Sequence, residues 1–179
     1  MTTPATTSSL AEALTAEALD ASATGYFTVH THANQHAGYF HPGAKPVHIL
    51  MHVGTDGQIL GAQAVGADGV DRRIDVIATA MRAGLKATDL IDLDLAYAPP
   101  YGQAKDPVNQ TGMVAHNVLT GELVLTGPNE LAEDMPVLDV RTPGEYAAGH
   151  MPNSLNIPHT QLRAWLGDRV EAVLVTGEG

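Results

Sequence analysis

Alternating apolar and polar positions predict β-strands in the first part of the chain. Between residues 26 and 32 the side chains alternate between two faces, with His30 and His32 on the same face. The segment 47–66 contains two apolar runs joined around Asp56-Gly57, a strong signal for a β-hairpin. These patterns predict antiparallel strands joined by a tight turn.

Three other segments in the first part of the chain have different patterns. Residues 1–9 are rich in Thr and Ser and are predicted to be a disordered tail, because they bury too little apolar surface to offset ordering. Residues 10–19 have apolar positions at helical spacing and are predicted to form a short helix. The segment 33–46 contains two Gly and two Pro and is expected to be a loop.

Three further helices are predicted after the hairpin. The first is expected to be capped by Asp71 and to end at Gly84, and a short second one to run from Thr88 to Leu93. Asp106-Pro107 predicts the start of a third, with a cap followed by a first-turn proline. The apolar stripe of the first helix consists of Ile74, Ile77, Ala78 and Met81. Strands followed by helices favour an α+β fold with helices on one face of an antiparallel sheet.

The remainder of the chain is predicted to be a separate unit. Residues 126–134 are polar, contain Gly-Pro and are typical of a domain linker. Beyond them, short apolar runs alternate with two helical segments, a β-α-β-α-β order that predicts a partial parallel α/β unit. The predicted division is therefore a tail at 1–9, an α+β domain at 10–125, a linker at 126–134 and an α/β unit at 135–179.

Composition and charge exclude several classes of function. The 179 residues include no cysteine, which excludes disulfides, thiolate catalysis and cysteine-ligated metals within this chain. The formal net charge of −11 argues against a nucleic-acid partner, since phosphate binding needs clustered cations. The N-terminus does not resemble a secretory signal and no apolar stretch is long enough for a membrane span, so a cytoplasmic protein is expected.

One long stretch of the chain resembles a known family. The motifs HAGYFHPGAKP, LDLAYAPPYG and KDPVN are similar to the C-terminal dimerisation domain of flavin-dependent pyridine nucleotide-disulfide oxidoreductases. Within that family the similarity points to the coenzyme A-disulfide reductase and NADH oxidase branch, and it covers residues 10–124. The stripe of the first predicted helix also needs an apolar partner, so we expect the chain to form a homodimer.

A second stretch, VLDVRTPGEYAAGHMPNSLNIPHTQL, resembles the opening of a rhodanese domain, which some members of the same branch carry at this place. The resemblance implies that about the first half of that domain is present and that Gly177 stands where the sulfurtransferase cysteine would align. It also implies a structural ion pair between Asp139 and Arg141, with Glu145 and His150 in the same frame. Sulfurtransferase activity is not expected.

The resemblance also implies where catalysis takes place in the family. FAD and NAD(P)H are bound there by two preceding domains with a GxGxxG turn, a spacing that this sequence lacks. The chain alone is thus expected to bind no cofactor and to be inactive, serving as the dimerisation and interaction portion of such an oxidoreductase. The alternative is that it forms the in-trans half of a split disulfide reductase, together with a separate FAD- and NAD(P)-binding chain.

Two tyrosines are the catalytic candidates that the resemblance provides. In the family, tyrosines of this domain approach the reactive sulfur of the other subunit, and the matching positions are Tyr39 and Tyr97. A phenol can donate a hydrogen bond or a proton to a leaving thiolate. Interface packing is the alternative role for both residues. The family's second aromatic hydroxyl is missing here, because Phe40 follows Tyr39.

Histidines and charged residues provide further candidates. His30 and His32 precede His36 and His41, which suggests a metal-binding module as a second alternative, although no residue is assigned as a ligand because a solvent-facing strand gives the same pattern. The charged residues at 72, 73 and 75 on the first predicted helix are expected at the surface or at a subunit interface.

Overall fold

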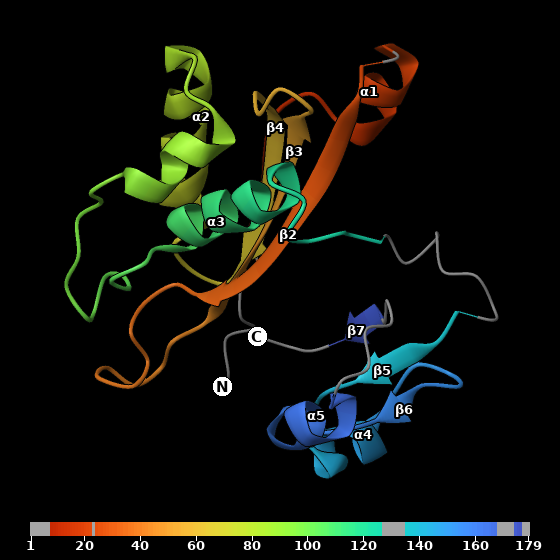
Figure 1. Cartoon of the computed structure of the whole chain (residues 1–179). Helices are drawn as coiled ribbons and strands as arrows, with labels where there is room; N and C mark the ends of the chain where they lie inside the picture. Colours follow the sequence, from red (N-terminus) through yellow and green to blue (C-terminus); the bar gives the residue numbers. More distant parts are fainter. Residues whose placement is uncertain (1–7, 23, 127–134, 168–173, 177–179) are drawn as a thin grey trace. The chain divides into compact units, whose positions relative to one another are not determined.

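The computed structural model describes residues 8–22, 24–126, 135–167 and 174–176. The chain divides into two compact units, Met1–Leu125 and Thr126–Gly179, which are described separately. In the first unit, four antiparallel strands form one sheet in the order β1-β4-β3-β2 (Figure 1). Their bounds are β1 Ser8–Ala13, β2 Tyr26–Asn34, β3 Pro46–Gly54 and β4 Ile59–Gly66.

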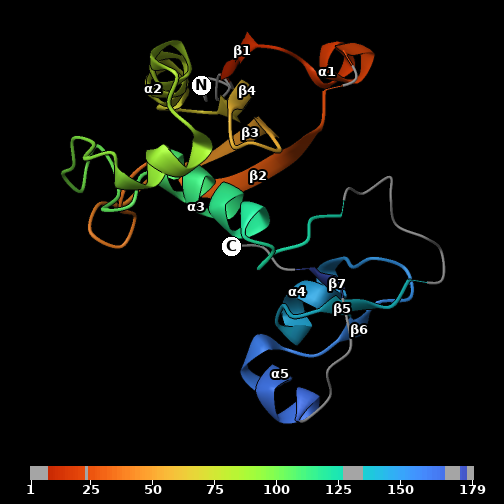
Figure 2. The same ribbon diagram turned by 45° about the horizontal axis from the view of Figure 1, so that its top comes forward.

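The beginning of the chain differs from the prediction. Residues 8–13 form strand β1, which pairs with β4 along the edge of the sheet (Figure 2), and only Ala16–Ser22 form a helix, α1. The prediction of a helix from residue 10 was therefore wrong, and residues 8 and 9 belong to a strand rather than to a tail. The physical reason is tertiary, because β4 offers a row of unpaired backbone groups that a neighbouring segment satisfies by pairing. Residues 1–7 lie outside the described part of the chain.

The predicted hairpin is confirmed. Strands β3 and β4 pair antiparallel, and Gly57 adopts a positive φ of 87° in the turn between them. The backbone N–H of Gly54 donates to the carbonyl of Gln58 at 2.8 Å, which closes the turn. Strand β2 pairs with β3, with His30 and His32 pointing away from the core while Val29 and Thr31 are buried, as the alternation predicts.

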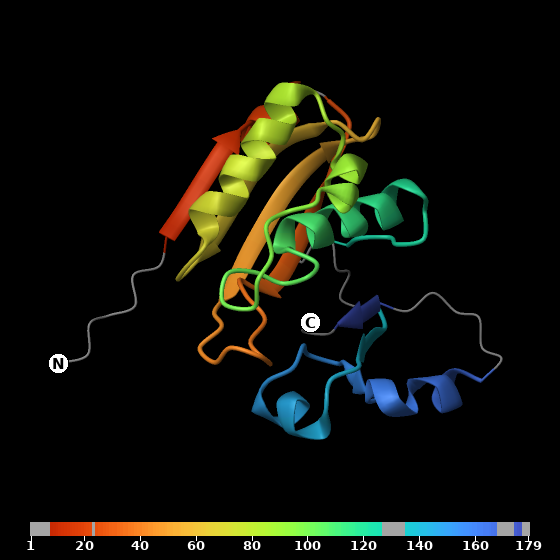
Figure 3. The ribbon, with the colours of Figure 1, turned by 90° about the vertical axis from the view of Figure 1, so that its left-hand side faces the viewer.

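Helices cover one face of this sheet, which confirms the predicted α+β class. Helix α2 (Val70–Ala83), the 3-10 helix η1 (Ala87–Asp92) and helix α3 (Pro107–Leu119) follow the hairpin, with α2 and α3 on the same side of the strands (Figure 3). The core between the layers is aliphatic and includes Val29, Ile49, Met51, Ile77, Leu90 and Val108.

The helix ends agree with the sequence signals in part. Asp106 caps α3 as predicted, accepting a hydrogen bond from the backbone N–H of Val108 at 3.1 Å, and Gly84 ends α2 in a left-handed conformation. The N-cap of α2 is Gly69 rather than Asp71, which lies in the first turn. The segment predicted as a short helix from Thr88 is a 3-10 helix that begins one residue earlier.

The second unit is a small parallel sheet with the order β6-β5-β7. Its elements are β5 Val137–Asp139, α4 Pro143–Ala148, β6 Leu155–Asn156, α5 His159–Leu166 and β7 Leu174–Thr176. Both neighbours pair parallel with β5, so the predicted alternation of strands and helices is confirmed. Most of the predicted linker lies outside the described residues. None of the helices in the described ranges is long and apolar enough to cross a membrane.

Candidate functional site: two tyrosine-bearing loops

The two loops that carry the candidate tyrosines are joined through their backbones. One loop connects β2 and β3, and the other, around residues 96–102, connects η1 and α3. The N–H of Ala37 lies 2.9 Å from the carbonyl oxygen of Gly102 and 3.3 Å from that of Pro99. The side-chain amide of Gln103 also donates to the carbonyl of Asn34 at 2.5 Å. Segments about sixty residues apart in sequence therefore form one local surface.

Tyr39 and Tyr97 meet on this surface. Their phenols lie close enough for Tyr39 to influence the Tyr97 hydroxyl, although the Tyr39 side chain is 76% exposed and that of Tyr97 is 47% exposed. Partial burial of Tyr97, together with the field and the hydrogen bond of Tyr39, raises the pKa of the Tyr97 phenol above its usual value. The phenol of Tyr97 therefore stays protonated, and thus able to donate a hydrogen bond, across the neutral and mildly alkaline range.

The same two loops carry further exposed aromatic rings. The rings of Tyr39 and Phe40 lie with centroids 4.7 Å apart, and Phe40 and Tyr101 are each 70% exposed. Exposed aromatic groups that cluster in this way are typical of a surface that contacts another molecule.

A buried ion pair beneath the loops was missed by the sequence analysis. Arg73, predicted at the surface, is 1% exposed and donates to both carboxylate oxygens of Asp106, at 3.1 Å and 2.7 Å. The same guanidinium donates to the carbonyl of Gln35 at 2.6 Å, in the tyrosine-bearing loop after β2, and to that of Gly69 at 2.9 Å. One signal was present in the sequence: Arg73 lies four residues before Ile77, and therefore on the buried face of α2.

The apolar stripe of α2 is already covered within the chain. Ile74 and Ile77 are buried in the core of the first unit, so the expectation that this stripe needs a partner was wrong. A different apolar surface lies on the other side of α2. It is a groove of about 490 Å³ between α2 and residues 85–95, lined by the side chains of Val76, Leu85, Leu93 and Leu95 and by smaller and charged groups of α2.

The histidines do not gather into the predicted group. His30 and His32 lie on the uncovered sheet face, whereas His36 is buried and its Nε2 lies 3.0 Å from the carbonyl oxygen of His41. Among the described residues, no group of three or more His, Cys, Asp or Glu side chains is arranged to hold a metal ion. The segment 30–41 therefore does not provide the ligand set that the metal-binding alternative required.

His52 is a buried histidine that the sequence analysis assigned no role. It is 2% exposed, its Nδ1 lies 2.9 Å from Thr28 Oγ1, and its Nε2 has no hydrogen-bond partner among the described residues. Burial lowers the pKa of the imidazole, the charge of His30 lowers it further, and Asp20 opposes the shift. His52 therefore resists protonation in the folded chain.

The second unit contains the predicted ion pair. Arg141 Nη2 donates to the buried Asp139 carboxylate at 2.6 Å and to the Gly149 carbonyl at 2.8 Å, which braces the turn after β5. Glu145 completes a capping box with Thr142, and the His150 ring stacks on Tyr146. Each of these groups has a structural partner. Gly177 lies outside the described residues.

The described helix N-termini of the first unit do not fit a dinucleotide. At the N-terminus of α2, a Cβ atom added to Gly69 would lie 2.4 Å from the Arg73 guanidinium. The arginine side chain therefore occupies the space in which a phosphate would bind. The N-terminus of α3 is occupied by the Asp106 carboxylate, which would repel a phosphate. FAD and nicotinamide dinucleotides therefore have no phosphate cradle at these two helices.

Comparison with known proteins agrees with this architecture. Residues 11–107 match the dimerisation domain of pyridine nucleotide-disulphide oxidoreductases, and residues 127–174 match the rhodanese-like domain. The chain therefore belongs to the pyridine nucleotide-disulphide oxidoreductase family through its dimerisation domain. The second unit matches the rhodanese-like domain that the sequence motif indicated.

Particular relatives are disulfide and persulfide reductases. The chain is 43% identical over 91 residues to a coenzyme A disulfide reductase of Staphylococcus aureus, covering 50% of this chain and 20% of that protein. The crystal structure of reduced CoADR-RHD from Bacillus anthracis is 40% identical, with a TM-score of 0.89 over 94% of this chain and 31% of that one. An NAD-dependent persulfide reductase from A. fulgidus is 32% identical, with a TM-score of 0.84 over 95% of this chain and 31% of that one. The chain thus spans about a fifth of the length of the curated relatives.

Proposed function

We propose that this chain is the dimerising portion of a flavin-dependent disulfide reductase and that it does not catalyse the reaction alone. The match to a dimerisation domain over residues 11–107 carries the proposal. Two features of the chain support it: the sequence has no cysteine, and the N-termini of α2 and α3 offer no phosphate cradle. FAD and NAD(P)H would be bound by other domains of the assembly.

The groove beside α2 is the surface that we assign to self-association. Its apolar lining and its volume of about 490 Å³ suit the side chains of a second copy, because burying exposed aliphatic groups is the main favourable term in association. Arg72, Asp71 and Asp75 line the same groove, so that two copies related by a two-fold axis can pair opposite charges at its rim.

Light scattering at micromolar concentration tests self-association. We expect the mass of a dimer for the unchanged chain and of a monomer for Val76→Glu, which places a charge in the groove. Val65→Glu is the control, because Val65 is exposed and lies on β4, outside that groove, whereas Val76 is half-buried. A backbone amide spectrum of Val76→Glu shows that this variant is folded. A monomeric unchanged chain would contradict the proposal, and dissociation by Val65→Glu alone would move the interface to the uncovered sheet face.

A second candidate function is that of the in-trans half of a split disulfide reductase. The observation that favours it is that Tyr39 and Tyr97, both partly exposed, lie together where their two loops are joined. In this hypothesis a partner chain with a cysteine and bound flavin reduces a disulfide, and the Tyr97 O–H donates its proton to the leaving thiolate sulfur. The phenolate then regains a proton from water, and Tyr39 positions the Tyr97 hydroxyl.

Reconstitution tests the second candidate. The chain is mixed with a flavin-containing disulfide reductase of the same family that lacks its own dimerisation domain, and NAD(P)H oxidation with a disulfide substrate is followed. Turnover should appear only in the mixture and should fall about 10²–10⁴-fold with Tyr97→Phe, while Tyr101→Phe, the matched control from the same loop, has little effect. Equal turnover with both variants would leave Tyr97 as an interface residue.

A further inference from the structure

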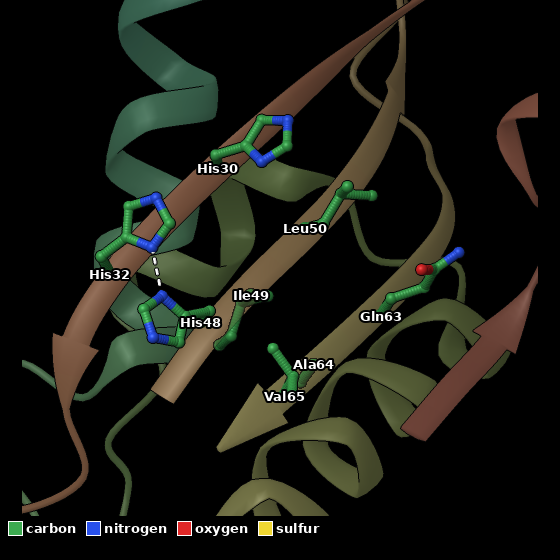
Figure 4. Close-up of a pocket in the computed structure, with 8 residues that line it drawn as sticks. All are labelled: His30, His32, His48, Ile49, Leu50, Gln63, Ala64 and Val65. Atoms are coloured by element: carbon green, nitrogen blue, oxygen red, sulfur yellow. Dashed lines mark hydrogen bonds between the residues drawn. The ribbon is translucent and has the colours of Figure 1, made fainter. Parts of the chain in front are cut away.

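Two histidines face each other on the uncovered face of the sheet. His32 on β2 and His48 on β3 are directly opposite in the antiparallel register. Their ring centroids lie 4.7 Å apart with an interplanar angle of 64°, and the two Nδ1 atoms are in contact (Figure 4). Neither α2 nor α3 covers this face (Figure 3). In sequence His32 lies near His30, His36 and His41, and only the strand register brings it to His48.

The facing nitrogen atoms have a chemical consequence. A neutral imidazole has one N–H and one lone pair, so an Nδ1–Nδ1 contact requires a proton between the two rings. A metal cation can take the place of that proton and accept both lone pairs. Bond lengths of about 2.0–2.1 Å and a tetrahedral angle place two ligand nitrogens about 3.3 Å apart, a separation that a small rotation of either ring provides.

The surroundings leave room for the rest of a coordination shell. The pair lines a recess of about 220 Å³, together with His30, Gln63 of β4 and several aliphatic groups. Figure 4 shows the rings of His30, His32 and His48 along the same face, with no cationic side chain drawn among the residues that line the recess. The net charge of −11 also favours a cation over an anion at an exposed site.

We propose that His32 and His48 form a two-imidazole binding site for a divalent transition-metal cation of the Cu²⁺, Ni²⁺ or Zn²⁺ class, with water in the remaining positions. The protein supplies only two ligands, in agreement with the absence of any three-residue cluster in the described ranges. Imidazole nitrogen suits these cations, and the usual order of stability places Cu²⁺ above Ni²⁺ and Zn²⁺. The site is independent of self-association and of any partner chain.

Calorimetric titration of the whole chain with NiCl₂ or CuSO₄ near neutral pH tests the site. We expect one ion per chain, with Cu²⁺ bound more tightly than Ni²⁺. His32→Ala and His48→Ala should each weaken binding by at least about tenfold, since even outer-shell changes weaken metal sites by 10–100-fold. His30→Ala is the matched control, because it removes a histidine from the same recess but not from the facing pair, and it should leave the affinity nearly unchanged.

Paramagnetic broadening by Ni²⁺ or Cu²⁺ identifies the ligands directly. The ring proton signals of His32 and His48 should broaden first, and a backbone amide spectrum of each variant shows that it is folded. Broadening centred on other histidines, a ratio of one ion to two chains, or equal losses in His30→Ala and His48→Ala would each overturn the proposal.

Discussion

Removing Arg73 should strongly destabilise the first unit. In Arg73→Met the Asp106 carboxylate loses both of its guanidinium hydrogen bonds, while it remains buried at 6% exposure. The carbonyls of Gln35 and Gly69 lose the same donor. Breaking a buried ion pair from one side costs about 3–5 kcal/mol, because it leaves an uncompensated charge.

The neighbouring Arg72 reduces this cost only slightly. Its Nη2 atom lies 3.7 Å from the Asp106 carboxylate, and its side chain is 42% exposed. An ion pair exposed to this extent stabilises a protein by no more than about 1 kcal/mol, so Arg72 replaces little of what Arg73 provides. We therefore expect Arg73→Met to lower the free energy of unfolding by about 3–4 kcal/mol. Arg72→Met is the matched control from the same helix and should cost less than about 1 kcal/mol.

Urea unfolding, followed through backbone amide signals of the first unit, measures both variants. The midpoint should fall in Arg73→Met with an unchanged m-value, which would identify a loss of stability rather than a change in the exposed surface. Faster amide exchange should appear in the loop that follows Gln35, because the guanidinium holds the carbonyl of that residue. A loss of less than about 1 kcal/mol in Arg73→Met would refute the argument that this pair is effectively buried.

Three further predictions concern packing and pH. Gly112→Ala should destabilise the first unit by about 1–3 kcal/mol in the same assay, because the added methyl group would lie 2.8 Å from a backbone oxygen of η1. Gly144→Ala in α4 meets nothing within 4 Å, so it should be neutral or stabilising when urea unfolding is followed through amide signals of the second unit. Burial is the main cause that lowers the pKa of the His52 imidazole in the folded chain. The stability that the neutral ring contributes is therefore complete above its pKa in the unfolded chain, about 6.5, and is lost as the pH falls through its lower pKa in the folded chain. His52→Asn should flatten that part of the stability–pH curve, and an unchanged slope would contradict the assignment. Hydrogen bonds from the neighbouring Arg141 lower the pKa of Asp139, so the second unit should lose stability as the pH falls below about 3.9. In Asp139→Asn the second unit should already be less stable at neutral pH. Fluorescence of Trp165, the only tryptophan in the sequence, monitors its unfolding.

Much of the fold could be predicted because its signals are local. The Asp56-Gly57 turn fixes the hairpin through the left-handed conformation that Gly57 adopts without steric cost. Asp106-Pro107 fixes the start of α3, because the carboxylate satisfies a free N–H and proline fits the first turn. The alternation of short strands and helices after residue 135 likewise predicts parallel pairing, which the β5–β6 and β5–β7 ladders confirm.

The errors in the prediction occur where distant segments decide the structure. Residues 10–13 belong to a segment with a helical pattern but form part of a strand, because pairing with the edge of β4 outweighs a weak intrinsic preference. Arg73 was expected at the surface or at a subunit interface. Its helical spacing from Ile77 indicates the buried face of α2, but its partners Asp106 and the carbonyl of Gln35 come from distant segments that only the folded chain brings to it.

The sequence by itself determined the class of the chain, most of the elements of both units and the two tyrosines to consider. Only the tertiary structure decided that the loops of Tyr39 and Tyr97 are joined, and that His32 faces His48. Turns, caps and periodicity depend on residues a few positions apart and can be recognised in a linear pattern. Loop contacts and strand register are set by packing between segments far apart in the chain, and they become visible only when the chain is folded.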